Sequence, residues 1–377
     1  MIKYIDLKAI NEPFIHAADE VLRGGWYLKG EYTRRFEQAY ARYIGTRHCI
    51  GCGNGLDALT LIFRAYKEMG VMKEGDEVIV PANTYIASIL AVTENGLQPV
   101  LVEPSADTLQ INDRLIEQAI TPRTRAVMIV HLYGRCAYTD NIGEICRHHS
   151  LKLIEDNAQA HGCRFLSPLT SHLSPQRTGS LGDAAGHSFY PTKNLGAFGD
   201  AGAVTTNDDE LAKTVEALGN YGSSRKYVFD YAGRNSRIDE LQAAMLLAKL
   251  PHLDAANGRR KEIAQRYQQE IVNSQVRLWP SCSGQRNDAV LPDSVYHIFP
   301  VFSTERDRLQ RYLADNGVET QIHYPIPPHH QKCFSNWSSL SLPLTERIHA
   351  EELSIPCHQA MTDEDVSRIV SLLNSAP

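Results

Sequence analysis

The chain has 377 residues, of which 43% are hydrophobic and 22% are charged, and its formal net charge is −6 at pH 7. This length and apolar content suit two packed domains with a core each. The mild charge and the scattered lysines and arginines argue against a nucleic-acid partner. No stretch resembles a signal peptide or a membrane span, so we expect a cytoplasmic protein without a membrane partner.

Eight cysteines are spread along the chain, and one close pair, Cys49 and Cys52, has CxxC spacing. Such a pair can be a redox couple or half of a zinc site. No second CxxC follows, and the pair lies in an apolar stretch, so we favour buried, reduced thiols and expect no metal.

From about residue 48, short β-branched runs alternate with helical patterns. Strands separated by helices indicate βαβ units and a largely parallel sheet, hence an α/β fold. The helix predicted at 83–96 is expected to be capped by Asn83 or Thr84. The predicted strands are 77–80, 99–102, 126–130, 151–155, 188–190 and 203–206, and the predicted helices between them are 83–96, 112–120 and 139–149.

The pattern changes after residue 251, where a helix at 257–272, a strand at 295–301 and a helix at 305–316 are predicted. We therefore predict a large domain at 1–251 and a smaller α+β domain at 252–377. Residues 162–180 lack periodicity and are predicted to form a surface loop.

Polar side chains follow several predicted strands. Tyr85, Asp156, Gln159 and Lys193 each come shortly after a strand, and glycines at 51–55 open a helix. Ligands bind at the carboxyl ends of parallel strands, and a glycine-rich helix start suits a phosphate. Taken singly, each feature also has a structural explanation: a turn lysine, a helix cap, a packed ring, a tight turn.

Together these groups match the needs of pyridoxal 5′-phosphate (PLP). The cofactor needs a phosphate anchor, an aromatic stacking partner, a carboxylate to keep its ring nitrogen protonated, and an amine for a Schiff base. The Gly-Lys-Ser/Thr ending of a nucleotide P-loop is absent. Burial of Lys193 beside that cation would favour its neutral, nucleophilic form.

Several motifs resemble the DegT/DnrJ/EryC1/StrS sugar aminotransferases over residues 4–372. They are GNGLDAL (53–59), PANTYIAS (81–88), VHLYG (130–134), IEDNAQAHG (154–162), SFYPTKNLGAFGDAGAVTTND (188–208), GRNSRIDELQAA (233–244) and HYPIPPHHQ (323–331). The resemblance implies an aspartate-aminotransferase-like PLP fold of type I, a large domain with a mostly parallel sheet, a smaller α+β domain, and a homodimer with active sites at the interface.

The resemblance also implies roles for single residues. Lys193 is expected to form the Schiff base and to shuttle the proton, Asp156 to face the pyridine nitrogen, and Gln159 to donate to the phenolic oxygen. The remaining expected cofactor contacts are stacking by Tyr85, phosphate binding by Ser188 with the backbone of Gly55 and Leu56, and phosphate binding by Asn235 from the second subunit.

Substrate contacts are expected from two segments. The loop carrying His323, Tyr324 and His329 resembles the family's sugar-pocket loop, and its prolines pre-shape it. Tyr221, Arg225 and Lys226 are candidate contacts to the diphosphate. For the two cations, a solvated surface pair is an equally good explanation.

The resemblance implies transfer of an amino group, in most of the family from L-glutamate, to a nucleotide-linked keto-sugar. The sequence of residues 78–104 and 321–331 is similar to members that aminate C3 of dTDP-3-keto-6-deoxyhexoses for surface polysaccharides such as lipopolysaccharide. Amination at C4 and a non-catalytic PLP-binding sensor stay open as alternatives. Lys193 argues against the related dehydratases, which carry histidine there, and the segment 162–178 is longer than is usual for the family.

Overall fold

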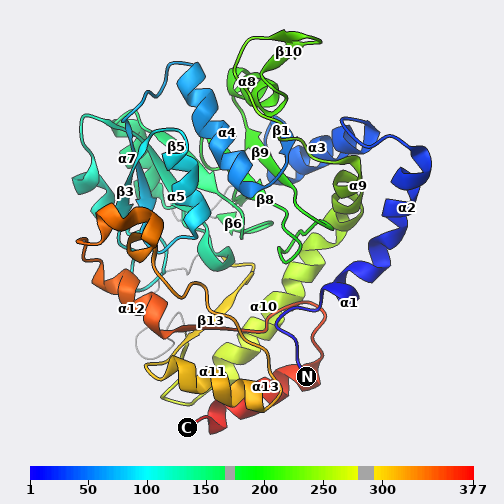
Figure 1. Ribbon diagram of the computed structural model, residues 1–377. Coiled ribbons are helices and arrows are strands. Elements are labelled where there is room, and N and C mark those ends of the chain that lie inside the picture. Colours follow the sequence, from blue (N-terminus) through cyan, green and yellow to red (C-terminus); the bar gives the residue numbers. More distant parts are fainter. Residues whose placement is uncertain (166–174, 279–292) are drawn as a thin grey trace.

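The computed structural model describes residues 1–165, 175–278 and 293–377. Its centre is a seven-stranded sheet in the order β1-β9-β8-β5-β4-β2-β3, in which only β9 runs antiparallel to its neighbours (Figure 1). This confirms the predicted α/β fold with a mostly parallel sheet. The strands are β1 His48–Cys52, β2 Glu77–Pro81, β3 Gln98–Val102, β4 Thr124–Val130, β5 Lys152–Asp156, β8 Ala184–Ser188 and β9 Gly202–Thr206.

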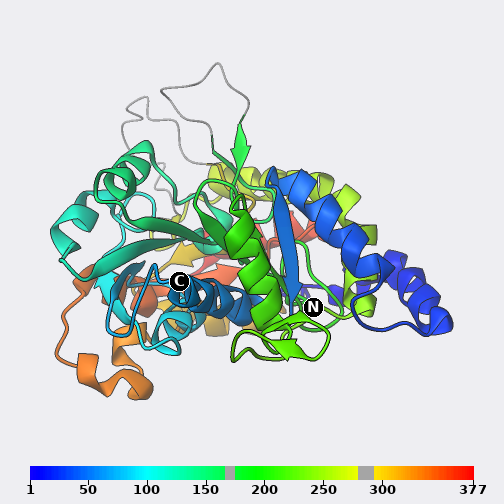
Figure 2. The ribbon, with the colours of Figure 1, turned by 90° about the horizontal axis from the view of Figure 1, so that it is seen from above.

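Helices cover both faces of this sheet, because alternate strand residues point to opposite sides. Val78 and Val80 pack toward one face, with α4 Gly55–Glu68, α5 Ile86–Thr93 and α8 Asp209–Gly219. Ile79 packs toward the other face, with α6 Asp113–Ile116 and α7 Asp140–His148. In Figure 2 the teal α7 and the green α8 lie on opposite sides of the strands.

The strand before Lys193 lies earlier than predicted. Residues 188–190 were expected to be extended, whereas β8 ends at Ser188. Its sequence, AAGHS, lacks β-branched residues because α4 packs closely on it: a Cβ added to Gly186 would lie 2.6 Å from Leu59 Cδ2. Close packing against a helix therefore hid this strand from a propensity-based prediction.

The helix predicted at 83–96 is shorter, and neither expected residue caps it. α5 begins after Tyr85, which makes no side-chain cap bond. The Asn83 amide instead donates to Leu109 O (2.9 Å), and the Thr84 hydroxyl bonds Ser88 Oγ (2.7 Å). The predicted helix at 112–120 is likewise divided into α6 and the 3₁₀ turn η2 Glu117–Ala119.

The N-terminal segment lies against both parts of the chain. α1 Leu7–Asn11, η1 Glu12–Phe14 and α2 Ile15–Gly24 lead into α3 Glu31–Ile44, which packs with α9 Glu240–Lys249. Ile2 pairs with Val318 and joins the C-terminal core.

The C-terminal part has its own hydrophobic cluster around the antiparallel strands β12 Arg277–Leu278, β13 Phe299–Phe302 and β14 Glu352–Ile355. Residues 295–298 were predicted as strand, but the Val295 amide donates to Gly134 O (2.8 Å) in the loop after β4. The domain boundary at residues 251 and 252 stays a prediction. The helices here are α10 Leu253–Glu270, α11 Arg306–Asp315, α12 Pro343–Glu351 and α13 Asp363–Ser375.

Cys49 and Cys52 lie buried in β1 as free thiols. Burial raises the pKa of both thiols, which supports the structural interpretation of the CxxC pair. The predicted loop 162–180 contains the paired strands β6 Arg164–Phe165 and β7 Gln176–Arg177. Its residues 166–174, and the Pro/Ser/Gly-rich passage at 279–288, lie outside the described residues. In the described part of the chain, no helix combines the length and the apolar character needed to cross a bilayer.

Candidate active site

The parallel strands β2, β4, β5 and β8 end at one edge of the sheet. Because the sequence places polar residues directly after these ends, the fold gathers Tyr85, Asp156, Gln159 and Lys193 at this edge. The sequence-predicted edge and the observed edge therefore coincide.

Lys193 lies in a turn after β8. Its backbone amide donates to Tyr190 O (2.8 Å), and its side chain is partly buried. Desolvation lowers the pKa of its ammonium from 10.5 to about 8, while the nearby Asp156 carboxylate partly opposes this shift. A substantial fraction of the amine is thus uncharged near neutral pH, which is what a nucleophilic lysine requires.

Asp156 is the last residue of β5 and is only 6% exposed. Its Oδ2 accepts from Ser88 Oγ (2.7 Å), and its Oδ1 accepts from the Ala158 amide (3.1 Å). Among the described residues no cation lies within ion-pair distance of it. A buried carboxylate that lacks a cation is costly, so the site fits a ligand that brings a positive charge, such as a protonated pyridine ring.

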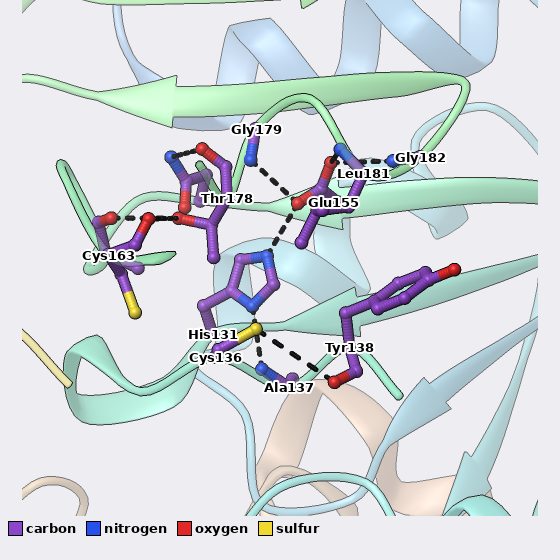
Figure 3. Close-up of polar contacts among 12 residues, drawn as sticks. His131, Cys136, Ala137, Tyr138, Glu155, Cys163, Thr178, Gly179, Leu181 and Gly182 are labelled. Atoms are coloured by element: carbon purple, nitrogen blue, oxygen red, sulfur yellow. Dashed lines mark hydrogen bonds and ion pairs between the residues drawn. The ribbon is translucent and has the colours of Figure 1, made fainter. Parts of the chain in front are cut away.

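The preceding residue, Glu155, is a buried carboxylate whose two oxygens both have hydrogen-bond donors (Figure 3). It accepts from the Gly179, Leu181 and Gly182 amides at 2.7–2.8 Å. His131 Nδ1 accepts from the Ala137 amide (2.9 Å), so its Nε2 carries the proton and donates to Glu155 (2.8 Å). Glu155 therefore fixes the end of β5, whereas its neighbour Asp156 faces the site.

The start of α4 is the candidate phosphate-binding site. Asn54 caps this helix by accepting from the Asp57 amide (2.8 Å), and the first amides of a helix have no intrahelical acceptor. A Cβ added to Gly55 would lie 2.5 Å from Ser188 Cβ, so only glycine allows the helix start to approach β8 this closely. Gly55 and Ser188 therefore lie side by side, and the amides of Gly55 and Leu56 with the Ser188 hydroxyl stay candidates for binding a dianion.

Gln159 links two aromatic residues at the same edge. Its Oε1 accepts from the Tyr133 amide (2.5 Å), and its Nε2 donates to the Tyr324 hydroxyl (3.0 Å). The rings of Tyr85 and Tyr324 lie 4.9 Å apart between centroids, and Tyr85 is 51% exposed. Nε2 keeps a second hydrogen for a ligand oxygen, and Tyr85 keeps an open face for stacking.

His323 lies on the C-terminal side of this edge. Its carbonyl accepts from the Tyr133 hydroxyl (2.6 Å), and its Nδ1 lies 2.7 Å from Ser354 Oγ. Desolvation, with a smaller contribution from the Lys193 charge, lowers its pKa to about 4. His323 is therefore a neutral imidazole near Lys193 in the pH range of most enzymes.

His329 does not join this group in the structure. Its side chain has no exposed surface, and its Nε2 lies 3.3 Å from Glu346 Oε1. A fully buried ring cannot touch a substrate that enters from solvent, so the structure gives no support to its predicted sugar contact and places it as a support for the loop.

Four other predicted residues lie on exposed segments. Arg225 ends β10 Ser223–Arg225, which forms a hairpin with β11 Val228–Phe229 that projects from the body (Figure 1). The cation–π contacts of this region are local: Lys226 lies over the Tyr227 ring (5.3 Å) and Arg237 over the Tyr221 ring (5.4 Å). Asn235 is exposed and pairs with Asn220 through its backbone. Within one chain, none of these four is seen in contact with the Lys193 group.

Sequence reasoning missed the residues that hold the predicted ones in place. Ser88 orients Asp156, and His297 Nδ1 bonds Asn194 Oδ1 (3.1 Å) next to Lys193. Ser88 lies inside the quoted PANTYIAS motif, so its position was visible but its partner was not. His297 comes from a segment about 100 residues away, and no local pattern connects the two.

Comparison with known proteins gives consistent matches. The profile of the DegT/DnrJ/EryC1/StrS aminotransferase family matches residues 8–374. The chain is 49% identical to dTDP-3-amino-3,6-dideoxy-alpha-D-galactopyranose transaminase of Aneurinibacillus thermoaerophilus, over 99% of both chains.

Solved structures agree. DesV of S. venezuelae, crystallised in complex with a ketimine intermediate, is 40% identical and superposes with a TM-score of 0.91 over 99% of this chain and 97% of that one. NtdA of Bacillus subtilis, solved with bound cofactor PMP, is 31% identical, with a TM-score of 0.82 over 98% of this chain and 82% of that one.

Proposed function

This chain belongs to the DegT/DnrJ/EryC1/StrS aminotransferase family, and we propose that it transfers the amino group of L-glutamate to C3 of a dTDP-linked 3-keto-6-deoxyhexose. It is a PLP-dependent sugar aminotransferase. The C3 position, the dTDP group, the donor and a role in surface polysaccharide synthesis are the proposed parts. The 49% identity to a dTDP-3-amino-sugar transaminase over 99% of both chains supports the choice of C3.

One observation supports the chemistry most directly. Lys193, whose pKa burial lowers to about 8, lies within electrostatic reach of Asp156, a buried carboxylate without a cation in the described chain. When bound, PLP supplies a carbonyl that takes up amines and an electron-poor ring that stabilises charge on the adjacent carbon. The residues at this edge fit that group in charge and in shape.

We assign the chain's own residues as follows. Lys193 would hold the cofactor covalently and, with its amine free, would move a proton at the reacting carbons. Asp156, held by Ser88 and the Ala158 amide, balances the positive ring nitrogen. Gln159 donates its free hydrogen to the phenolic oxygen, and Tyr85 stacks on the ring.

The phosphate and the sugar are bound by the remaining predicted residues. Gly55, Leu56 and Ser188 anchor the phosphate through backbone amides and a hydroxyl. His323 and Tyr324 face the sugar. The exposed positions of Tyr221, Arg225, Lys226 and Asn235 support a homodimer in which these residues complete the site of the other subunit.

Product analysis tests the proposal. The purified protein with PLP is incubated with L-glutamate and either dTDP-3-keto- or dTDP-4-keto-6-deoxyhexose, and NMR locates the new amine. We expect the amine on C3. An amine on C4 would overturn the choice of carbon and leave the aminotransferase assignment intact.

A second measurement separates the enzyme from a PLP-binding sensor. Glutamate alone should remove the visible absorbance of the PLP-loaded protein and release one 2-oxo acid per site. A loaded protein that keeps its colour and releases no 2-oxo acid would favour the sensor.

A further inference from the structure

Three polar groups form a continuous chain behind the imidazole of His323. His323 Nδ1 lies 2.7 Å from Ser354 Oγ, and Ser354 Oγ makes a short hydrogen bond to Glu352 Oε1. The second oxygen of the same carboxyl group, Oε2, accepts from the His323 backbone amide (2.6 Å). Glu352 and Ser354 both lie in β14 and have no exposed surface.

Two further hydrogen bonds hold the backbone of His323 and of the next residue. Tyr133 donates to the His323 carbonyl (2.6 Å), and His349 Nδ1 lies 2.7 Å from the Tyr324 carbonyl. The other ring nitrogen of His323, Nε2, has no hydrogen bond to any described residue. Nε2 is therefore the ring nitrogen that remains available to a ligand, and the Lys193 charge acts on the same imidazole.

Counting hydrogen bonds gives two states for the group formed by Glu352, Ser354 and His323, because a serine hydroxyl has one hydrogen to donate. If Glu352 is ionised, Ser354 donates to it and can only accept from His323. Nδ1 then carries the ring proton, and Nε2 is an acceptor. If Glu352 is protonated, it donates to Ser354, and Ser354 donates to Nδ1. The ring proton is then on Nε2, which becomes a donor.

We propose that Glu352 and Ser354 form a proton relay that sets the tautomer of His323 and so decides whether this residue offers a donor or an acceptor to the nucleotide sugar. The part concerning the sugar rests on the proposed function. Proton balance is simple: a proton taken up at Nε2 moves the Nδ1 proton to Ser354 and the Ser354 proton to Glu352. The positive charge is thereby never left on the ring beside Lys193. Glu352 is a positioning residue, because it acts through His323.

The electrostatics favour this path. Burial raises the pKa of Glu352 to about 8, and burial with the Lys193 charge lowers that of His323 to about 4. An added proton therefore resides on the carboxyl group and not on the ring. Below about pH 8 Nε2 is the donor, which suits a keto or hydroxyl oxygen of a sugar, and above it Nε2 becomes an acceptor.

Apart from Lys193, whose pKa is also about 8, the neighbouring groups around the relay do not titrate in this range. The neighbouring tyrosines Tyr4, Tyr133 and Tyr324 have pKa values raised above 10 by burial, so they stay neutral. Tyr4 also approaches Ser354. Because the single Ser354 hydrogen is used within the relay in both states, Tyr4 acts as a donor to Ser354 Oγ, and the counting is unchanged. Arg306 donates to the Glu352 carbonyl (3.3 Å), and its charge partly opposes the rise in the Glu352 pKa. Burial and the charges of Lys193 and Arg260 hold the pKa of His297 well below its usual value, so His297 stays neutral.

Nitrogen NMR of the histidine-labelled, PLP-loaded protein tests the relay directly. The His323 signal is identified by its loss in His323→Gln. We expect a ring proton on Nε2 at pH 6.5 and on Nδ1 at pH 9.5 in the wild type. In Glu352→Gln the amide can donate to Ser354 at every pH, so the proton should stay on Nε2. These pH values are chosen about 1.5 units either side of the expected midpoint.

Two further variants and one rate measurement complete the test. Lys193→Ala should keep the switch, which separates it from the titration of Lys193, and Ser354→Ala should abolish it. The kcat/KM for the sugar should fall about tenfold from pH 7 to pH 9 in the wild type and less than about twofold in Glu352→Gln. An unchanged tautomer in the wild type, or a switch that persists in Glu352→Gln, overturns the relay. A switch in a protein that aminates no sugar leaves the relay intact and overturns the proposed function.

Discussion

The carboxyl edge of the sheet and the β10–β11 hairpin differ in how complete they are within one chain. At the sheet edge, Asp156 and Gln159 each have two hydrogen bonds with defined partners. On and beside the hairpin, Arg225 and Lys226 are exposed and contact residues close in sequence: Ser223 bonds the Arg225 carbonyl, and Lys226 lies over the Tyr227 ring. The residues at the sheet edge are therefore ordered within one chain, whereas in the homodimer that we propose the hairpin residues would find their partners in the second chain.

The largest expected effect is at the sheet edge. Lys193→Ala removes the only amine of the predicted cofactor group, and we expect the turnover number to fall by a factor on the order of 10⁴ or more. Steady-state release of 2-oxoglutarate from glutamate, with the keto-sugar present, measures it.

Two controls apply to this variant. It should still bind PLP without a covalent link, and its thermal unfolding should remain cooperative. Turnover within tenfold of the wild type would show that another residue carries the covalent step.

The next effect concerns the charge at the base of the same site. Asp156→Asn keeps the shape but removes the negative charge, and we expect kcat to fall about 100-fold with PLP still bound. Ser88→Ala is the matched control, because it removes one hydrogen bond to Asp156 (2.7 Å) and keeps the carboxylate, so its effect should be much smaller.

Single-turnover reaction of the loaded enzyme with glutamate measures both variants. Equal rates for Asp156→Asn and the wild type would mean that a different group balances the ring nitrogen.

The third prediction addresses the hairpin. The double variant Arg225→Ala/Lys226→Ala should raise KM for the nucleotide sugar about 10-fold, because it removes two cations from the diphosphate, and should leave the glutamate half-reaction unaffected.

Mixed dimers then test whether the two regions come from different chains. A hairpin variant mixed with Lys193→Ala forms heterodimers in which one site has both intact halves. The mixture should recover about a quarter of wild-type activity at low sugar concentration, since half the dimers are mixed and half their sites are intact. No recovery after verified subunit exchange would place both regions in the same chain.

The two regions also differ in how far the sequence predicted them. The strand–helix alternation and the polar residues after each strand predicted the sheet edge, because strand ends are fixed by local patterns. Its supporting partners were missed: Ser88, His297 and Glu352 reach the site through tertiary packing, which local spacing does not encode. His329 was misplaced for the same reason, since burial against Glu346 follows from α12, which begins 14 residues later.

The hairpin limits the sequence analysis in another way. The sequence supports two interpretations of Arg225 and Lys226 equally well, as contacts to a ligand or as a solvated pair. The structure of a single chain is compatible with both interpretations. The information that decides between them is in the contact with a second molecule, which neither the pattern of one sequence nor the fold of one chain contains.

The smallest expected effect is on the pH dependence of PLP binding. It tests the electrostatics around Lys193 at the sheet edge. The pKa of Lys193 is lowered from 10.5 to about 8, so its amine loses the proton as the pH rises through about 8. The rate at which cofactor-free protein captures PLP, followed by visible absorbance, should therefore rise about tenfold between pH 7 and pH 9. Because the Asp156 carboxylate raises this pKa, Asp156→Asn should move the midpoint to lower pH. Glu352→Gln removes a different group with a pKa of about 8 and should leave the midpoint in place. A midpoint near 10 in the wild type would show that Lys193 is solvated before the cofactor binds. Water would then be excluded from the site only when PLP binds.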